Sequence, residues 1–200
     1  MSRHIEKETR VMISQEEYVS ICSDIFKSNP YAQYVNQTNY YFDTDDFEFS
    51  NNHQVVRIRE KSHMYELTVK IKGEDGDIEI NQNISDRLAH KYLRNGSLPH
   101  GEVYNAVAAL GISPKKLKVI ASCYTRRIDV KYDDYLLVID MNRYDDIEDY
   151  NIEIESDISV AHAREVLKRY CEQYQLTYQE DYLVKSARAI KHAREKLASA

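Results

Sequence analysis

Acidic side chains alternate along strand-like segments near both ends of the chain. Each Glu-x-Glu pair places its two carboxylates on one face of an extended segment, because successive side chains of a strand point to opposite faces. Gathered carboxylate oxygens are the ligands that hard divalent cations such as Mg²⁺ or Mn²⁺ prefer. The candidate metal ligands are Glu6, Glu8, Asp140, Glu153 and Glu155.

Basic side chains follow the same two-residue period in the central segments. Arginine and lysine on one face suit a polyanion that carries several phosphates. A surface that serves only solubility mixes the two signs along each strand, whereas here acids cluster on the terminal strands and bases on the central ones. The candidate phosphate-binding residues from this pattern are Arg57, Arg59, Lys70, Lys72 and Arg127, with Lys131 on the same face.

Positioning these side chains requires a sheet, and the alternation of apolar and polar residues predicts about eight strands. Because hairpin spacing dominates, we expect the sheet to be largely antiparallel, and eight strands are enough to close a barrel. The fold class that we predict is α+β, an eight-stranded antiparallel β-barrel or tunnel with ionic side chains inside and helices packed outside. The predicted strands are residues 4–13, 37–43, 54–60, 65–72, 77–83, 118–132, 135–143 and 150–155.

Helical periodicity supplies the elements that would cover the apolar faces. Ser14 and Glu17 form the pattern of a capping box, and the helix that follows should end at Asn29. A polar stretch at residues 43–52 ends the strand before it, and the segment Gly73–Gly76 is expected to be a hairpin turn. The other predicted helices are 85–94, 102–110, 160–174 and one that begins at residue 186.

Composition sets limits on the class of protein. The 200 residues carry 27 basic and 33 acidic side chains, a net charge of −6, which argues against duplex nucleic acid as the main ligand. No apolar run approaches the ~20 residues of a membrane helix, and the charged N-terminus lacks a signal-peptide pattern. Three widely spaced cysteines fit a reducing cytoplasm. The oligomeric state is left open.

Seven ordered segments resemble those of the CYTH superfamily, also called triphosphate tunnel metalloenzymes. The opening Glu-Lys-Glu-Thr-Arg resembles the family's Glu-x-Glu-x-Lys signature, and the last segment resembles the Lys-Ser-x-Arg of small bacterial members. The resemblance implies one domain over residues 4–190, followed by a helical tail at 191–200. The matching segments are Glu6–Arg10, Tyr40–Thr44, Val56–Arg59, Thr68–Lys70, Leu137–Asp140, Ile152–Glu155 and Lys185–Arg188.

The resemblance implies metal-dependent hydrolysis of a small-molecule triphosphate inside a charged tunnel. Inorganic tripolyphosphate is favoured as the substrate, giving pyrophosphate and phosphate. Glu6 and Glu8 would be catalytic, and both would also bind the metal together with Asp140, Glu153 and Glu155. The phosphate-binding residues that the matching implies are Arg10, Arg57, Arg59, Lys70, Lys72, Arg127 and Lys185.

The chain departs from the family pattern at two places. Arg10 replaces the lysine of the opening motif, and the planar guanidinium changes the geometry there. Glu79 matches an acidic family position, but Asn81 is neutral where many members have a second acid, so a structural role for Glu79 competes with a functional one. Asp129 is expected to pair with Arg127 or Lys131 rather than to bind a ligand.

Two other functions stay open at this point. An adenylyl cyclase of the same fold would convert ATP to cyclic AMP and pyrophosphate. A binder of nucleotide or polyphosphate would use the bases but would gain nothing from five carboxylates unless a metal also binds. The compact size and the absence of an adenine-recognition motif favour the inorganic substrate.

Overall fold

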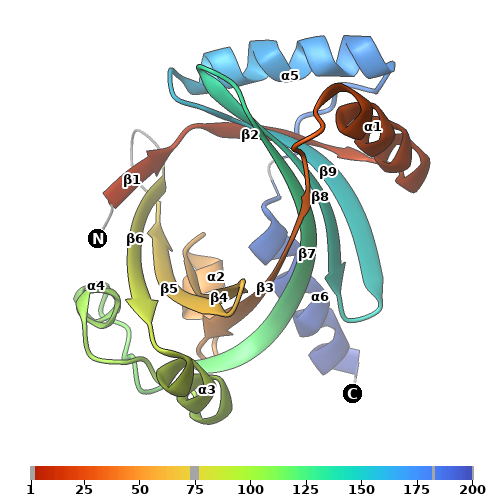
Figure 1. Ribbon diagram of the computed structural model, residues 1–200. Helices are drawn as coiled ribbons and strands as arrows, with labels where there is room; N and C mark the ends of the chain where they lie inside the picture. Colours follow the sequence, from red (N-terminus) through yellow and green to blue (C-terminus); the bar gives the residue numbers. More distant parts are fainter. Residues whose placement is uncertain (1–2, 73–76, 182, 200) are drawn as a thin grey trace. The chain divides into compact units, whose positions relative to one another are not determined.

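The computed structural model describes residues 3–72, 77–181 and 183–199, and the side chains of these except at 3–6 and 77. Nine strands and six helices are formed by these residues (Figure 1). The strands are β1 (Arg3–Glu6), β2 (Glu8–Ile13), β3 (Tyr34–Asp43), β4 (Val55–Lys61), β5 (Met64–Ile71), β6 (Asp77–Ile84), β7 (Lys118–Lys131), β8 (Tyr135–Tyr144) and β9 (Ile147–Ser156). The helices are α1 (Gln15–Ser28), α2 (Glu48–Asn51), α3 (Asp86–Asn95), α4 (Glu102–Ala109), α5 (Val160–Tyr174) and α6 (Lys185–Ser199).

The chain folds into two compact units. The first unit contains Gln37–Cys123, the segment before Glu6 and the segment from Lys185 onward, and the second unit contains Glu6–Asn36 and Tyr124–Val184. Strands β3 and β7 each contribute residues to both units. Among the described residues, no helix combines the length and the apolar character that a membrane span requires.

In the second unit, the strands lie in the order β7, β8, β9, β2, and every pairing in this row is antiparallel. One face of these strands is apolar and packs against α1 and α5 (Figure 1). Val11, Ile139 and Ile152 from the strands and Leu167 from α5 are fully buried in this core. Since the apolar side chains occupy alternate positions, the polar side chains of the same strands must share the other face.

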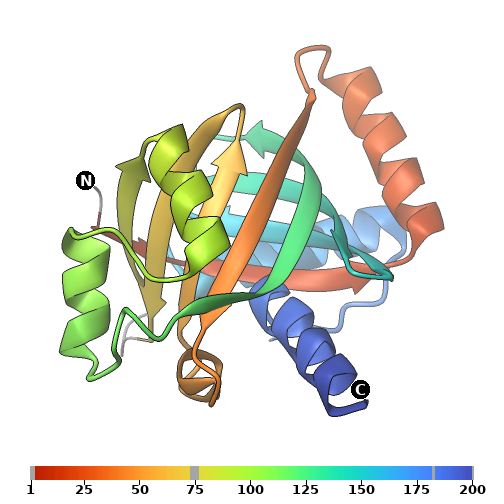
Figure 2. The same cartoon turned by 90° about the horizontal axis from the view of Figure 1, so that it is seen from below.

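In the first unit, β3, β4, β5 and β6 pair in sequence order, again antiparallel. Their apolar face packs against helices α2, α3 and α4, and Figure 2 shows α3 lying along these strands. Ile58 and Leu67 from the strands and Val103 from α4 are fully buried there. The two units therefore repeat one plan, in which helices cover the apolar face of antiparallel strands and polar residues occupy the opposite face.

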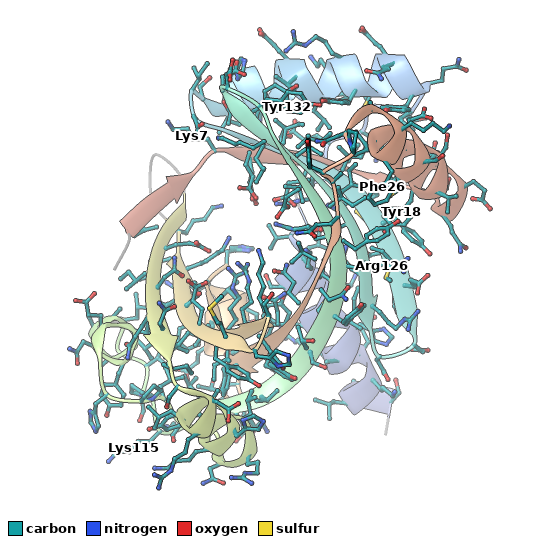
Figure 3. The ribbon with its side chains drawn as sticks, viewed as in Figure 1. Lys7, Tyr18, Phe26, Lys115, Arg126 and Tyr132 are labelled. Carbon is teal, nitrogen blue, oxygen red and sulfur yellow. The ribbon has the colours of Figure 1, made fainter. Side chains whose placement is uncertain are left out.

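The predicted α+β class and the antiparallel strands covered by helices are confirmed. The predicted strand at residues 4–13 is divided into β1 and β2 at Lys7, which gives nine strands instead of eight. Lys7 Nζ donates hydrogen bonds to the carbonyl oxygens of Asp157 and Ile158, both at 3.1 Å, just before α5 begins (Figure 3). The Lys7 side chain is therefore bound to the backbone that precedes α5.

The polar stretch at residues 43–52 contains the short helix α2, which the sequence pattern does not predict. The cause is Asp43, whose fully buried carboxylate accepts hydrogen bonds from the backbone N–H groups of Thr44, Phe49 and Ser50 at 2.8–3.0 Å. One side chain thus organises the whole segment. The predicted turn Gly73–Gly76 lies outside the described residues.

Candidate functional site

Three carboxylates meet on the polar face of the second unit, and we call Glu8, Glu153 and Glu155 the acidic cluster. Glu8 of β2 lies opposite Glu155 of β9 in the strand register. One carboxylate oxygen from each of the three lies within 4.8 Å of the others. Glu153 is buried, while Glu8 and Glu155 are partly exposed. The antiparallel register of β2 and β9 therefore brings together acids from opposite ends of the chain, as the sequence pattern predicted.

The donor set of the acidic cluster fits a hard divalent cation. All three candidate ligands are carboxylate oxygens, which suit Mg²⁺ and Mn²⁺ and do not favour softer metals. A set of three acids converging on one face is also costly unless positive charge balances it. Glu8, Glu153 and Glu155 would hold the ion.

Arg10 supplies part of that balancing charge. It follows Glu8 on the same face of β2 and lies opposite Glu153 in the register. Its Nη2 atom forms an ion pair with Glu8 and lies 3.4 Å from Glu153 Oε1. Burial by itself lowers the pKa of Arg10, but the charges of Glu153 and Glu8 raise it above its usual value, so the guanidinium stays protonated.

A second ion pair lies on the same face, one strand further along. Arg127 of β7 binds Asp140 of β8 through two parallel hydrogen bonds of 2.8 Å, and Asp140 is fully buried. Arg127 also lies 3.9 Å from Glu155 and 3.8 Å from Asp129, as expected for a partner role of Asp129. Burial lowers the pKa of Arg127, but Asp140 raises it well above the ordinary value. Lys131 pairs instead with Asp157.

The bidentate pair places Asp140 differently from the other predicted ligands. Asp140 is engaged by Arg127 and is not a member of the three-carboxylate group. Arginine and carboxylate in this geometry hold each other in a fixed orientation. Asp140 thus holds Arg127 beside Glu155.

The polar face of the first unit carries the predicted bases. We call Arg57 and Arg59 of β4 and Lys70 of β5 the basic cluster. Arg57 is buried, with 9% of its surface exposed, and its Nε atom has no hydrogen-bond partner among the described residues. Arg59 donates from Nε to Asn39 Oδ1 at 3.2 Å and lies 4.0 Å from Glu66. A buried N–H donor without a partner is costly and is typical of a site that binds an acceptor.

Glu79 of β6 is the counter-ion of the basic cluster. Its carboxylate lies 3.0 Å from Lys70 and 3.3 Å from Arg57, and Asn81 donates to it at 3.4 Å. Burial raises the pKa of Glu79, but Lys70 and Arg57 outweigh this and lower it to about 2. Asn81 is itself held by a hydrogen bond of 2.7 Å from Thr68. Glu79 is therefore a fixed negative charge between two bases, a role that the sequence pattern left undecided.

The structure adds one basic residue that the sequence reasoning did not select. Burial raises the pKa of Tyr41 of β3, and the nearby charges of Arg57, Arg59 and Arg188 lower it by less. Arg188 of α6 thus acts electrostatically on the same polar face as the basic cluster. It belongs to the Lys-Ser-Ala-Arg segment, so the motif could have identified it.

The remaining predicted residues are placed as follows. Lys72 lies just beyond the end of β5 and is exposed, so it does not continue the alternation with Lys70. Lys185 is the first residue of α6 and is partly exposed, three positions before Arg188. Glu6 ends β1, and its side chain lies outside the described part of the structure.

Comparison with known proteins identifies the family of this chain. A model of the CYTH domain matches residues 4–186. A Bacillus subtilis (strain 168) protein named "Putative triphosphatase YjbK" is 33% identical over 156 residues, which cover 78% of this chain and 80% of that protein.

Solved structures agree with this match. A "putative adenylate cyclase" from Bacillus halodurans superposes with a TM-score of 0.82 at 30% identity, covering 92% of this chain and 97% of the other. A Hippeastrum protein described as a "putative adenylyl cyclase" with a dominant triphosphatase activity has a TM-score of 0.74 at 19% identity, covering 93% and 94%. The family model and the 33% identical relative each span most of the chain. This chain therefore belongs to the CYTH domain family.

Proposed function

We propose that this protein hydrolyses a triphosphate with the help of a divalent metal, and that inorganic tripolyphosphate is the substrate. The observation that carries the proposal is the acidic cluster, in which Glu8, Glu153 and Glu155 bring carboxylate oxygens within 4.8 Å of one another. Such a group would repel phosphate by itself, whereas a divalent cation held by the carboxylates would offset their charge and attract the phosphate oxygens. Membership of a family with a relative named as a triphosphatase supports the same class of reaction.

The acidic cluster would hold Mg²⁺ or Mn²⁺, with Glu6 and Asp140 as further proposed ligands. When bound, the ion would neutralise phosphate charge and act as a Lewis acid on phosphoryl oxygens. Glu8, which is partly exposed, would accept the proton of the attacking water. Hydrolysis at the terminal phosphorus would release phosphate and leave pyrophosphate.

The bases would bind and orient the phosphate chain. Arg127 is held rigidly by Asp140, so its remaining N–H groups have a fixed direction. Arg57 has a buried Nε donor that a phosphate oxygen would satisfy. Preorganised donors of this kind stabilise the charge of a transferring phosphoryl group at little reorganisation cost. The proposed phosphate-binding residues are Arg10, Arg57, Arg59, Lys70, Lys72, Arg127 and Lys185.

A phosphate-release assay tests the proposal. The protein is incubated with tripolyphosphate, ATP, GTP or thiamine triphosphate, each with Mg²⁺, Mn²⁺ or EDTA. We expect metal-dependent release from tripolyphosphate to exceed release from the others, and we expect EDTA to abolish it. Equal phosphate release in the presence of EDTA would contradict the metal dependence. Faster phosphate release from ATP, GTP or thiamine triphosphate would contradict the choice of tripolyphosphate as the substrate.

A matched pair of variants connects the reaction to the acidic cluster. Glu153→Gln removes one carboxylate of the cluster and should lower turnover by about 100-fold or more, the scale of losing a principal electrostatic group. Glu148→Gln is the control, since Glu148 lies on the same strand, pairs with Arg143 and is not part of the cluster. Similar turnover in both variants would contradict the assignment of the cluster.

The cyclase alternative is tested in the same reactions. The Bacillus halodurans relative is named for an adenylate cyclase, so the products from ATP must be separated by chromatography. Cyclic AMP with pyrophosphate would favour that function, whereas ADP or no reaction agrees with the triphosphatase proposal. Binding of tripolyphosphate without any turnover or metal dependence would favour a pure binder.

We also propose a cytoplasmic location. Cys22, Cys123 and Cys171 are all buried thiols. Buried free thiols suit a compartment that keeps cysteine reduced.

A further inference from the structure

One nitrogen atom of Arg10 contacts two of the three carboxylates of the acidic cluster. Nη2 pairs with Glu8 Oε1 and stands 3.4 Å from Glu153 Oε1. We infer that Arg10 is a built-in competitor of the metal, which holds Glu8 and Glu153 until a divalent cation displaces it and which then becomes a ligand of the phosphate chain. This inference rests on the proposed function and adds a coupling between its two ligands.

The geometry of the pair supports competition. Glu8, Glu153 and Glu155 each offer an oxygen within 4.8 Å of the others, and a cation that they share must lie among these oxygens. The guanidinium nitrogen already contacts two members of this group. A full positive charge at that position repels a divalent ion and occupies carboxylate lone pairs that the ion needs. The guanidinium and the metal ion therefore cannot bind the same carboxylate oxygens at the same time.

The position of Arg10 in the sheet explains why the competition is built in. Arg10 lies two residues after Glu8 on β2, hence on the same face, and opposite Glu153 on β9. The register therefore brings the guanidinium to both acids without any loop movement. Its side chain is 92% buried, so the ion pairs are little screened by water.

The residue type matters as much as the position. The corresponding residue of the family signature is lysine, a compact point charge with three rotatable donors. A guanidinium carries five N–H donors in a planar fork, so one group can reach two carboxylates or hold one carboxylate and a phosphate. The guanidinium of Arg10 therefore suits simultaneous contact with Glu8 and Glu153.

Displacement of Arg10 couples the two ligands. Once a cation holds Glu8 and Glu153, the guanidinium has lost its partners and favours a new anion, which the phosphate chain provides. By linkage, phosphate that engages Arg10 must in turn strengthen metal binding by the same factor. The metal and the triphosphate would thus bind cooperatively.

The test measures the binding of Mn²⁺ alone, by isothermal titration calorimetry, without substrate. We compare the unaltered protein with Arg10→Gln and with the control Arg143→Gln, which removes an exposed arginine of the same sheet that pairs with Glu148. We expect Arg10→Gln to bind Mn²⁺ at least about tenfold more tightly, the effect of removing one nearby positive charge, and Arg143→Gln to match the unaltered protein. Damage to the site would weaken binding, so unchanged or weaker binding by Arg10→Gln overturns the inference.

A second measurement does not depend on the folding of Arg10→Gln. The Nε–Hε NMR signal of Arg10, assigned by its absence in Arg10→Lys, is followed while Mg²⁺ is added to the unaltered protein. We expect the signal to shift in step with Mg²⁺ binding, and a stationary signal during saturable binding overturns the inference.

The outcomes also separate this inference from the proposed function. The unaltered protein could bind metal and hydrolyse triphosphate while Arg10→Gln binds Mn²⁺ no more tightly. That result would contradict only the role inferred for Arg10 and would leave the proposed function standing. Absence of metal binding in the unaltered protein and in both Arg10 variants removes the inference and the proposed function together.

Discussion

At the scale of single residues, buried charges on the polar faces are held by charges of the opposite sign. Glu79 lies between Lys70 and Arg57, and Asp140 is bound by Arg127. Such pairs are costly to bury, but removing one member leaves the other uncompensated. These two sets of ion pairs therefore hold Arg57, Lys70 and Arg127 in place before any ligand binds.

Glu79 should make stability depend on pH in the acid range. Its pKa in the folded protein, about 2, lies below its ordinary value of 4.5, so its contribution is complete above about pH 4.5 and is lost as pH falls toward 2. Between pH 6 and pH 3 the free energy of unfolding should fall by about 2 kcal/mol through this group alone. Glu79→Gln should lose that part of the slope, as measured by urea unfolding across this range.

The comparison needs a control for the many other acids. Replacing the exposed Glu165 by glutamine should leave the slope unchanged. An identical slope in Glu79→Gln and the unaltered protein would show that Glu79 is not ionised against Lys70 and Arg57 as described.

The pair of Arg127 and Asp140 gives a second prediction. Asp140→Ala leaves the guanidinium without its bidentate partner on a buried face and should lower the free energy of unfolding by about 3–5 kcal/mol. Adding Arg127→Met to Asp140→Ala should restore part of the loss, because it removes the unpaired charge. Chemical denaturation of both variants measures this, and an equal or larger loss in the double variant would contradict the explanation.

These ionic partners mark the limit of what the sequence predicts at the residue scale. Alternation placed Arg57 with Arg59, and Glu153 with Glu155, on common faces. It could not show that Glu79 would bridge Arg57 and Lys70, because that depends on the register of β4, β5 and β6. For the same reason the contact of Arg10 with Glu153 could be found only in the folded chain.

At the scale of elements, helices stabilise the strands from the face opposite the polar groups. Helix α1 begins with the predicted capping box, in which Glu17 N–H donates to Ser14 Oγ while Glu17 accepts from the Ser14 backbone. Helix α5 has the predicted bounds and buries Leu167 among the strands of the second unit. Elements with strong periodicity and caps were thus predictable, whereas α2 depends on the buried Asp43 and was not.

This separation of faces predicts that stability and metal binding respond to different changes. Leu167→Ala should lower the free energy of unfolding by about 2–5 kcal/mol through a core cavity. The folded variant should bind Mn²⁺ as the unaltered protein does, because Leu167 packs on the apolar face. Thermal unfolding and calorimetry measure the two effects. Leu197→Ala, at an exposed position of α6, is the control and should change stability by less than about 0.5 kcal/mol.

At the scale of the whole molecule, each of the two units carries one named cluster together with counter-ions of the opposite sign, Arg10 and Arg127 in the second unit and Glu79 in the first. The acidic cluster belongs to the second unit and the basic cluster to the first. Each unit uses antiparallel strands with helices on the apolar face, so the polar face is available for ligand chemistry. The sequence pattern predicted that acids and bases would share faces of strands, because each follows the two-residue period, but it did not predict two units.

The most direct test of the central claim is the location of bound metal. Crystals grown with Mn²⁺ and tripolyphosphate should give an anomalous diffraction peak at manganese. We predict that the peak lies within coordination distance, about 2–2.5 Å, of carboxylate oxygens of Glu8, Glu153 and Glu155. A manganese peak bound only by other residues, with these three carboxylates uncoordinated, would contradict the account.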